Sequence, residues 1–281
     1  MSPATRRSRR RGGRPPPRRR DAVSSYVAKA APHKLQALQR HLQPLRPRHE
    51  NTRDNLAWYM GVTDKQPYID HARQVHRLVK RLPHTREQQL ALHHARQILS
   101  WYEAFSLKDN YAYRDSRAAE NLRWWQRYTG DKVAYWAAAA HTADAPGLQV
   151  VPGGQSVRFD SAGSHLRRWY GDAYRSVGVT FDHGTLNDGP GCGTAPATVP
   201  RPAADFVNRA LGDAGLDEYA VDLRSPAPKA VLDWLRAPAK LRGYRAYTPE
   251  QPQKSYMTGG SLAQWFDVIV HRREITPCTP L

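Results

Sequence analysis

The chain has 281 residues, 40% of them hydrophobic, so it is long enough to bury a core in one large domain or two small ones. Its longest apolar run, Val133 to Ala140, is far too short to cross a bilayer, and no apolar segment follows the basic N-terminus as a secretory signal requires. Two cysteines, Cys192 and Cys278, exclude a disulfide framework and a cysteine zinc site. These features predict a soluble, cytoplasmic protein.

Half of the net charge of +18 lies at the N-terminus, where residues 1–20 hold nine arginines and no acid. We expect residues 1–21 to form a disordered tail rich in Arg and Pro, and residues 22–281 to form one α/β domain. An arginine run binds phosphate without sequence preference, but no zinc-finger or helix-turn-helix signature accompanies it, so specific nucleic-acid binding is not predicted. A misplaced start or a frameshift in a GC-rich gene would give the same composition.

From Ala22 to Gln126 the apolar residues recur at helical spacing. Two stripes predict amphipathic helices, one ending at Pro83 and the other before Lys108. A third helix should run from about Tyr111 to Tyr128 and end at Gly130. The two stripes consist of Tyr68, Ala72, Val75, Val79 and Leu82, and of Ala91, Ala95, Ile98, Tyr102 and Phe105.

After Gly130 the pattern changes to apolar strands that alternate with helices. This alternation predicts an α/β fold in which the N-terminal helical region packs on a partial, mainly parallel sheet. Residues 188–202 and 246–260 should be long loops. The expected strands are Lys132–Ala140, Ser176–Phe181 and Phe266–Val270, and the expected helices are His165–Tyr170, Ala203–Leu211 and Lys229–Leu235.

The helix that begins near Tyr111 carries a first group of candidate functional residues. Arg114, Ala118, Asn121 and Trp125 share one of its faces. A guanidinium and an amide on that face are suited to bind an oxygen-rich ligand or to stabilise a developing oxyanion. Arg114 and Asn121 are therefore candidate substrate-binding residues; the alternative is an internal pair between Arg114 and Asp115.

A single histidine, His141, follows the small-residue segment Lys132–Ala140. If that segment is a strand, His141 lies at its carboxyl end, where open α/β sheets bind ligands, and its imidazole can act as a general base. The alternative is a histidine that caps the strand end. A short turn would make the preceding helix and this strand neighbours, so we expect Arg114 and His141 at the same edge of the sheet.

The other histidines lack the spacing of metal ligands along a helix. His93 and His94 are adjacent, and His71 and His76 are five residues apart rather than four. No metal and no other cofactor is predicted. The chain also has no Gly-x-Ser-x-Gly sequence, so a serine hydrolase of the usual α/β type is not expected.

Taken in order, the two groups resemble motifs of the erythromycin esterase family. Tyr113–Trp125 is similar to that family's helix motif of Arg-Asp, Ala-Glu-Asn and an aromatic residue, and Tyr135–His141 is similar to its Trp-Ala-His-Asn-x-His strand motif. Gly163–Leu166, Val177–Phe181 and the ending from Phe266 to Leu281 also have the family's pattern. The likeness runs from about Ala22 to the C-terminus.

The resemblance implies a three-layer-like fold of that type and a hydrolase that cleaves a carboxylic ester or a macrolide lactone. Water activated by histidine would do the chemistry, without a metal or a serine nucleophile. His141 falls on the second histidine of the strand motif and would be catalytic. Arg114 and Asn121 fall on the helix motif and would bind the substrate, a small molecule.

Two departures from the family pattern change this expectation. Ala138 stands where the strand motif has its first histidine, and nothing before Ala22 matches the family's Gly-Glu-x-x-His-Gly segment. We therefore expect a domain truncated at its N-terminal side. The alternative function is a catalytically impaired remnant, or a small-molecule binding protein of the same fold. The sequence does not predict the oligomeric state.

Overall fold

The computed structural model describes residues 19–152, 154–187, 196–243 and 253–277. By its contacts the chain divides into two compact units, one ending at Lys108 and the other beginning at Asp109. The expectations for the tail up to residue 18, for both cysteines and for loop residues 188–195 and 246–252 lie outside the described residues. No helix of the described ranges is both long enough and apolar enough to span a membrane.

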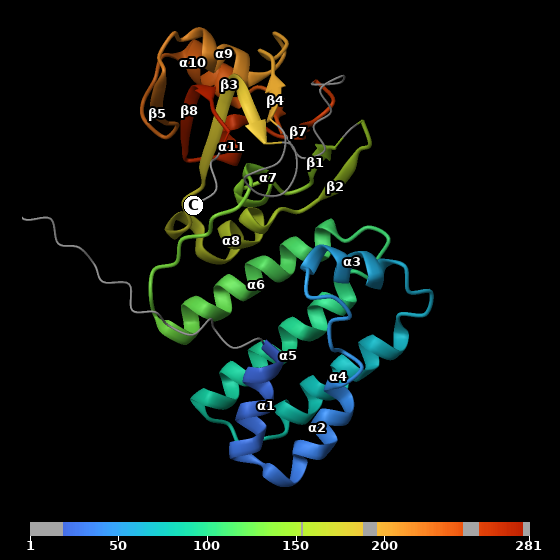
Figure 1. Ribbon diagram of the computed structural model, residues 1–281. Coiled ribbons are helices and arrows are strands. Elements are labelled where there is room, and N and C mark those ends of the chain that lie inside the picture. The colour runs from blue at the N-terminus through green and yellow to red at the C-terminus, as the bar shows by residue number, and fades with distance from the viewer. Residues whose placement is uncertain (1–18, 153, 188–195, 244–252, 278–281) are drawn as a thin grey trace, which may run out of the picture. The chain divides into compact units, whose positions relative to one another are not determined.

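The first unit is helical in all its regular elements (Figure 1). Both predicted stripes are confirmed, since their residues are buried or packed against the core of this unit. The first helix begins at Arg19, three residues before the expected start of the domain at residue 22, and the Arg20 guanidinium donates to the Leu45 carbonyl over 2.9 Å. The helices are α1 (Arg19–Ala30), α2 (Leu35–Leu42), α3 (Thr52–Met60), α4 (Gln66–Lys80) and α5 (Arg86–Ala104), with a 3₁₀ turn at Pro32–Lys34.

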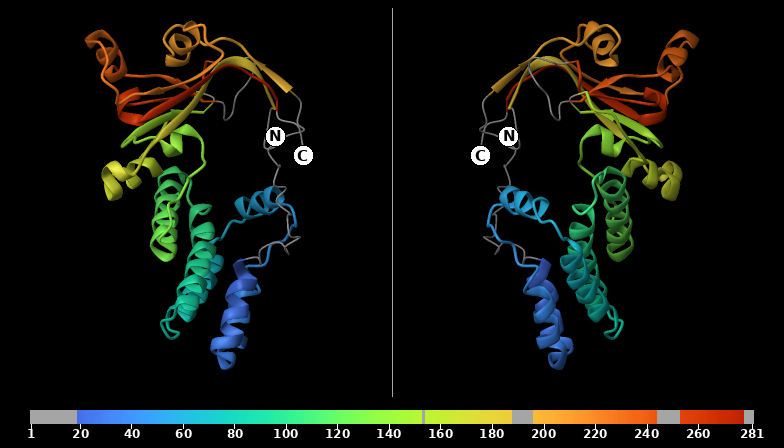
Figure 2. Two further views of the ribbon diagram at one scale, coloured as in Figure 1. Left: turned by 90° about the vertical axis from the view of Figure 1, so that its left-hand side faces the viewer. Right: turned by 90° about the vertical axis from the view of Figure 1, so that its right-hand side faces the viewer.

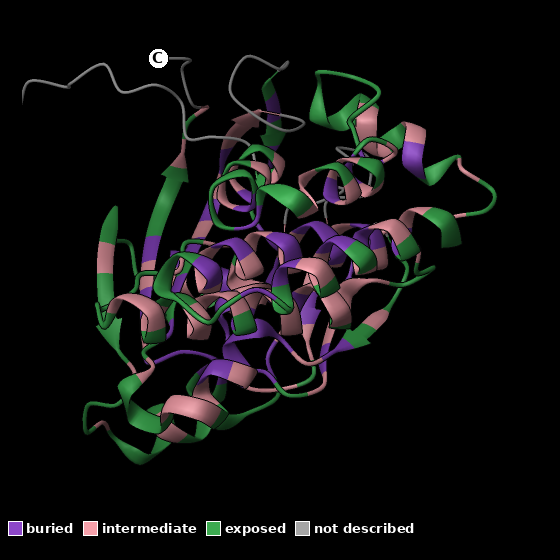
Figure 3. Cartoon of the chain, turned by 90° about the horizontal axis from the view of Figure 1, so that it is seen from below, coloured by how far each residue is buried: buried purple, intermediate pink, exposed green. Residues whose placement is uncertain are grey.

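Aromatic rings fill the core of the helical unit, where buried residues line the inward faces of the helices (Figure 3). The ring of Tyr59 is fully buried and meets Tyr102 edge-on, with centroids 5.0 Å apart. The Tyr59 hydroxyl donates to the Tyr102 carbonyl at 3.1 Å, and the Tyr102 hydroxyl donates to the Leu45 carbonyl at 3.0 Å. Burial raises the pKa of Tyr102 to about 12, so its hydroxyl remains a donor.

The second unit begins with the long helix α6 (Tyr111–Thr129), which ends as predicted at Gly130 in the left-handed conformation (φ 79°). Two four-stranded sheets follow, in the orders β2-β1-β7-β6 and β4-β3-β8-β5. Figure 2 shows the long strand β3 running alongside β8. The strands are β1 (Leu148–Val151), β2 (Val157–Phe159), β3 (Val177–Asn187), β4 (Pro196–Val199), β5 (Glu218–Asp222), β6 (Leu241–Arg242), β7 (Tyr256–Thr258) and β8 (Val268–Ile275), and the helices are α7 (Ala139–Thr142), α8 (Ala162–Tyr170), α9 (Val207–Asp213), α10 (Lys229–Arg236) and α11 (Leu262–Trp265), with a 3₁₀ turn at Gly171–Ala173.

The α/β class is confirmed, but the expectation of a mainly parallel sheet is wrong. Among the strand pairs of the described residues, only β3 with β8 is parallel. Chain length explains the difference: β1 joins β2, and β3 joins β4, through connections too short for a crossover, so these pairs must be antiparallel. β3 and β8 can be parallel because many residues, including the three helices α9, α10 and α11, separate them in sequence.

The strand predicted at Lys132–Ala140 is also wrong. Residues 130–138 have no regular structure, and Ala139–Thr142 form the short helix α7. No described strand pairs with this segment, and Trp136 is 92% exposed. The physical reason is that an apolar run becomes a strand only where a neighbour accepts its backbone hydrogen bonds, and alanine has little preference for strands.

A buried histidine lies on the inner face of the second sheet. His271 of β8 is fully buried, and its Nδ1 lies 2.9 Å from the Thr180 hydroxyl of the adjacent strand. Burial lowers the pKa of His271, and the nearby Asp182 carboxylate only partly opposes this shift. Burial therefore favours the neutral form of this imidazole in the folded state.

We predict that the stability supplied by His271 depends on pH. Its folded pKa is lowered, so the contribution is complete above the unfolded pKa of about 6.5 and is lost as pH falls below that value, because the unfolded chain then takes up a proton that the folded chain does not. Urea unfolding of the wild type and of His271→Asn between pH 7.5 and 5 should show the wild type's advantage shrinking toward low pH. An advantage that is constant over this range would contradict a neutral buried imidazole.

Candidate active site

His141 and Asp115 form a hydrogen-bonded pair between α7 and the N-terminal part of α6. The His141 Nδ1 lies 2.8 Å from one carboxylate oxygen of Asp115 and 3.0 Å from the other. Asp115 is 2% exposed, whereas the His141 side chain is 21% exposed. A carboxylate only accepts hydrogen bonds, so Nδ1 of His141 carries a proton, and in the neutral imidazole Nε2 is then the nitrogen with the free lone pair. This arrangement fixes the orientation of the imidazole ring.

A second donor holds the Asp115 carboxylate. The backbone N–H of Ala162, the first residue of α8, donates to Oδ2 of Asp115 over 2.8 Å. A helix N-terminus favours negative charge because its N–H groups and its dipole both point toward the anion. The buried carboxylate is thus fixed between α8 and His141.

The backbone of α7 is held in place by hydroxyl groups from the residues just before α8 and just before β3. The Ser161 hydroxyl donates to the Ala143 carbonyl at 2.6 Å. The Thr142 carbonyl accepts from the Ser176 hydroxyl at 2.7 Å and from the Tyr174 hydroxyl at 2.5 Å. Burial raises the pKa of Tyr174 to about 12, so this phenol stays protonated and continues to donate. These bonds fix a helix too short to be stable by itself.

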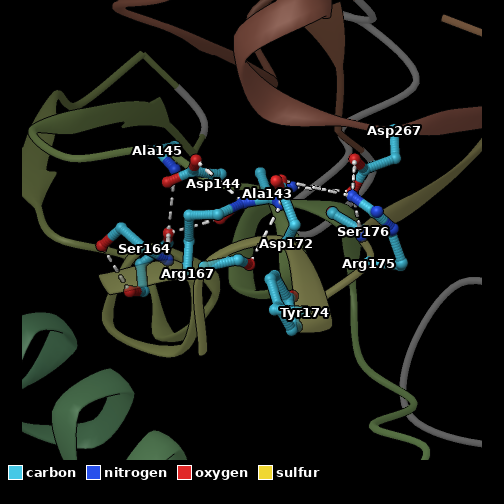
Figure 4. A network of polar contacts seen from close by, with 12 residues as sticks. Ala143, Asp144, Ala145, Ser164, Arg167, Asp172, Tyr174, Arg175, Ser176 and Asp267 are labelled. Atoms are coloured by element: carbon cyan, nitrogen blue, oxygen red, sulfur yellow. Dashed lines mark hydrogen bonds and ion pairs between the residues drawn. The ribbon is translucent and has the colours of Figure 1, made fainter. Parts of the chain in front are cut away.

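A network of ion pairs follows α7 and joins it to β3 and β8 (Figure 4). The Arg167 guanidinium contacts Asp267 at 2.7 Å and Asp144 at 3.3 Å, and the Ser176 N–H donates to Asp267 at 2.8 Å. Burial raises the pKa of Asp144. Burial alone would also raise the pKa of Asp267, but the hydrogen bonds from Ser176 and Arg167 bring it below its usual value.

Arg114 and Asn121 are half-buried on α6, as their shared face predicts. In the ranges that the structure describes, the Arg114 guanidinium has no hydrogen-bond or ion-pair partner, so it does not form the internal pair with Asp115 that the sequence left open. Burial and the charge of Asp115 raise the pKa of Tyr135, and the charge of Arg114 lowers it. The net shift is upward. The Asn121 Oδ1 is buried without a hydrogen-bond partner.

The residue that sequence reasoning missed is Asp115. It was considered only as a partner for its neighbour Arg114, whereas the structure brings it to His141, 26 positions further along the chain. The available signal was its helical spacing from Ala119, four residues later, which places both on one face; both are buried. His141 still lies beside the N-terminal part of α6, although α7 and not a strand delivers it.

A family comparison agrees with this fold. The model of the erythromycin esterase family matches residues 16–275, so the chain belongs to the erythromycin esterase family. No characterised protein with a curated record matches the chain.

Solved structures share the fold at low sequence identity. A succinoglycan biosynthesis protein is 22% identical with a TM-score of 0.71, over 91% of this chain and 61% of its own. A Bacillus cereus protein is 20% identical with a TM-score of 0.73, over 91% and 63%. A mutant of the erythromycin esterase EreC, in its open conformation, is 16% identical with a TM-score of 0.56, over 90% and 65%. The chain thus spans less than two thirds of each of these proteins.

We predict that Gly163→Ala disrupts the support of His141. A Cβ at this position would lie 2.2 Å from the Ala143 carbonyl oxygen and 2.3 Å from that of Thr142, and backbone atoms cannot move aside cheaply. The substitution should lower the free energy of unfolding by about 1–3 kcal/mol or more, measured by urea denaturation. Gly243→Ala is the matched control, because its nearest contact would be an ordinary 3.5 Å. If both substitutions lower the free energy of unfolding by the same small amount, the close approach of α8 to α7 is contradicted.

Proposed function

We propose that the protein is a hydrolase that cleaves a carboxylic ester or a macrolide lactone, with His141 as the general base. The observation that supports this most directly is the bond from His141 Nδ1 to the buried carboxylate of Asp115. It leaves Nε2 as a proton acceptor on a partly exposed ring, which general base catalysis requires. Family membership supports hydrolysis as the reaction.

In the proposed reaction, a water molecule next to His141 loses a proton to Nε2 while its oxygen attacks the ester carbonyl carbon. The carbonyl π electrons move to oxygen, and the tetrahedral intermediate then collapses with loss of the alkoxide, which takes the proton back from the imidazolium. Asp115 stabilises that imidazolium without being protonated itself. Its anchoring by Ala162 keeps the ring in the reactive orientation throughout.

Arg114 and Asn121 are the proposed substrate-binding residues. The Arg114 guanidinium has no partner within the described chain, so it remains available to a substrate oxygen, where it would stabilise the negative charge of the intermediate. The buried Asn121 Oδ1 lacks a donor, which a substrate hydroxyl would supply. We infer a small-molecule substrate and a cytoplasmic location.

A second candidate function is a protein of this fold that binds a small molecule but turns it over poorly. The observation that favours it is Ala138, which lies exposed immediately before α7 and offers no second imidazole beside His141. Binding without turnover of the same ester would support this candidate.

The proposed reaction is tested by removing each member of the pair. His141→Asn should lower kcat/KM for p-nitrophenyl acetate and for erythromycin by roughly 10²-fold or more, because the base is lost. Asp115→Asn should cost roughly as much, because an amide no longer selects the Nδ1–H tautomer. Product formation is followed by absorbance for the phenol and by mass spectrometry for the opened lactone.

His84→Asn and Asp131→Asn are matched controls, since both residues are exposed. They should leave kcat/KM unchanged, and thermal unfolding of all four variants shows whether each is folded. Full activity in a folded His141→Asn would overturn the proposed base. If the wild type binds both esters by calorimetry but hydrolyses neither, the binding protein is the correct function.

A further inference from the structure

Two histidines from different helices of the first unit meet at their Nδ1 atoms. His41 of α2 and His71 of α4 have these nitrogens 3.0 Å apart, although 30 positions separate them in sequence. Their ring centroids are 5.3 Å apart and their planes are inclined at 52°. At this separation a single bridging ion can contact both nitrogens.

The helices that carry the two rings are rigidly packed. Each histidine directly precedes a core residue: Leu42 after His41 is 3% exposed, and Ala72 after His71 is fully buried. Both belong to the same hydrophobic cluster, and α2 and α4 are in contact (Figure 1). The rings themselves are half-buried, so solvent and small ions reach them. A ligand that joins both nitrogens would find them already positioned.

We propose that His41 and His71 form a binding site for a divalent late transition-metal ion such as Zn²⁺ or Cu²⁺. Two nitrogens on one tetrahedral zinc, at bonds of about 2.05 Å, stand about 3.3 Å apart. On a square-planar ion they stand about 2.9 Å apart. The observed 3.0 Å lies between these two values, so rotation of the rings by a small amount suffices.

Protons balance in this step. Without metal, one imidazole carries its proton on Nδ1 and donates it to the other Nδ1. A bound ion needs the lone pair of both, so the donating ring moves its proton to Nε2 by exchange with solvent, and neither ring changes its net protonation. If either ring is an imidazolium, one proton must leave for bulk water on binding.

The electrostatics of the pair favour the neutral form that a metal requires. The pKa of His41 is lowered, first by burial and then by the charges of His71 and Arg40. Arg40 also repels a bound cation. No third His, Cys, Asp or Glu joins the pair among the described residues, so water fills the other coordination positions. The site is therefore a helix-to-helix clamp of modest affinity.

Calorimetric titration of the full chain with ZnCl₂ at pH 7.5, together with thermal unfolding, tests the site. Zn²⁺ should bind and raise the Tm of the helical unit, because the unfolded chain does not hold the two rings together. His41→Asn and His71→Asn should each lower the affinity at least about tenfold. His33→Asn, an exposed histidine in the turn before α2, is the matched control and should bind as the wild type does.

Comparing different metal ions and varying the pH provide two further tests. Cu²⁺ should bind more tightly than Zn²⁺, and Mg²⁺ should not bind. Affinity should fall as the pH is lowered, because protons compete with the metal ion for the imidazole nitrogens. In the wild type, imidazole ¹⁵N resonances of His41 and His71 should shift on Zn²⁺ addition more than those of other histidines, a readout that needs no variant to fold. Equal binding by wild type and both single variants, or shifts at other histidines only, would overturn the proposal.

Discussion

The second unit is organised around one buried carboxylate, that of Asp115. Burying a charge is costly unless donors surround it, and here the donors are the His141 imidazole and the first N–H group of α8. Both must stay where they are for the carboxylate to remain satisfied. The same two bonds that meet this cost therefore set the position and the tautomer of His141.

α8 supports this arrangement through its N-cap residue and its first two residues. Ser161 before it bonds to α7, Ala162 bonds to Asp115, and Gly163 lets the backbone of α7 approach more closely than any side chain would allow. Because α7 is only four residues long, its order comes from these contacts and not from its own helix propensity. The orientation of the imidazole thus depends on a helix that contributes no side chain to the His141–Asp115 pair.

The helical unit shows the same dependence on packing in its two paired histidines. His41 and His71 meet only because apolar stripes on α2 and α4 bring these helices into contact. Each histidine taken alone is an ordinary helix residue. Their proximity places two imidazole nitrogens 3.0 Å apart, in a pair separate from that of Asp115 and His141.

The sequence alone determined the elements whose signal is local. The stripe from Ala72 to Val79, the end of α6 at Gly130, the α/β class and the family follow from spacing and motif, because helical periodicity and a glycine cap act within a few residues. The strand direction, the irregular segment before His141, and the partners of His141 and His71 were decided only by tertiary structure. The physical reason is that hydrogen bonds between distant residues, such as that from His141 to Asp115, leave no periodic trace in the chain.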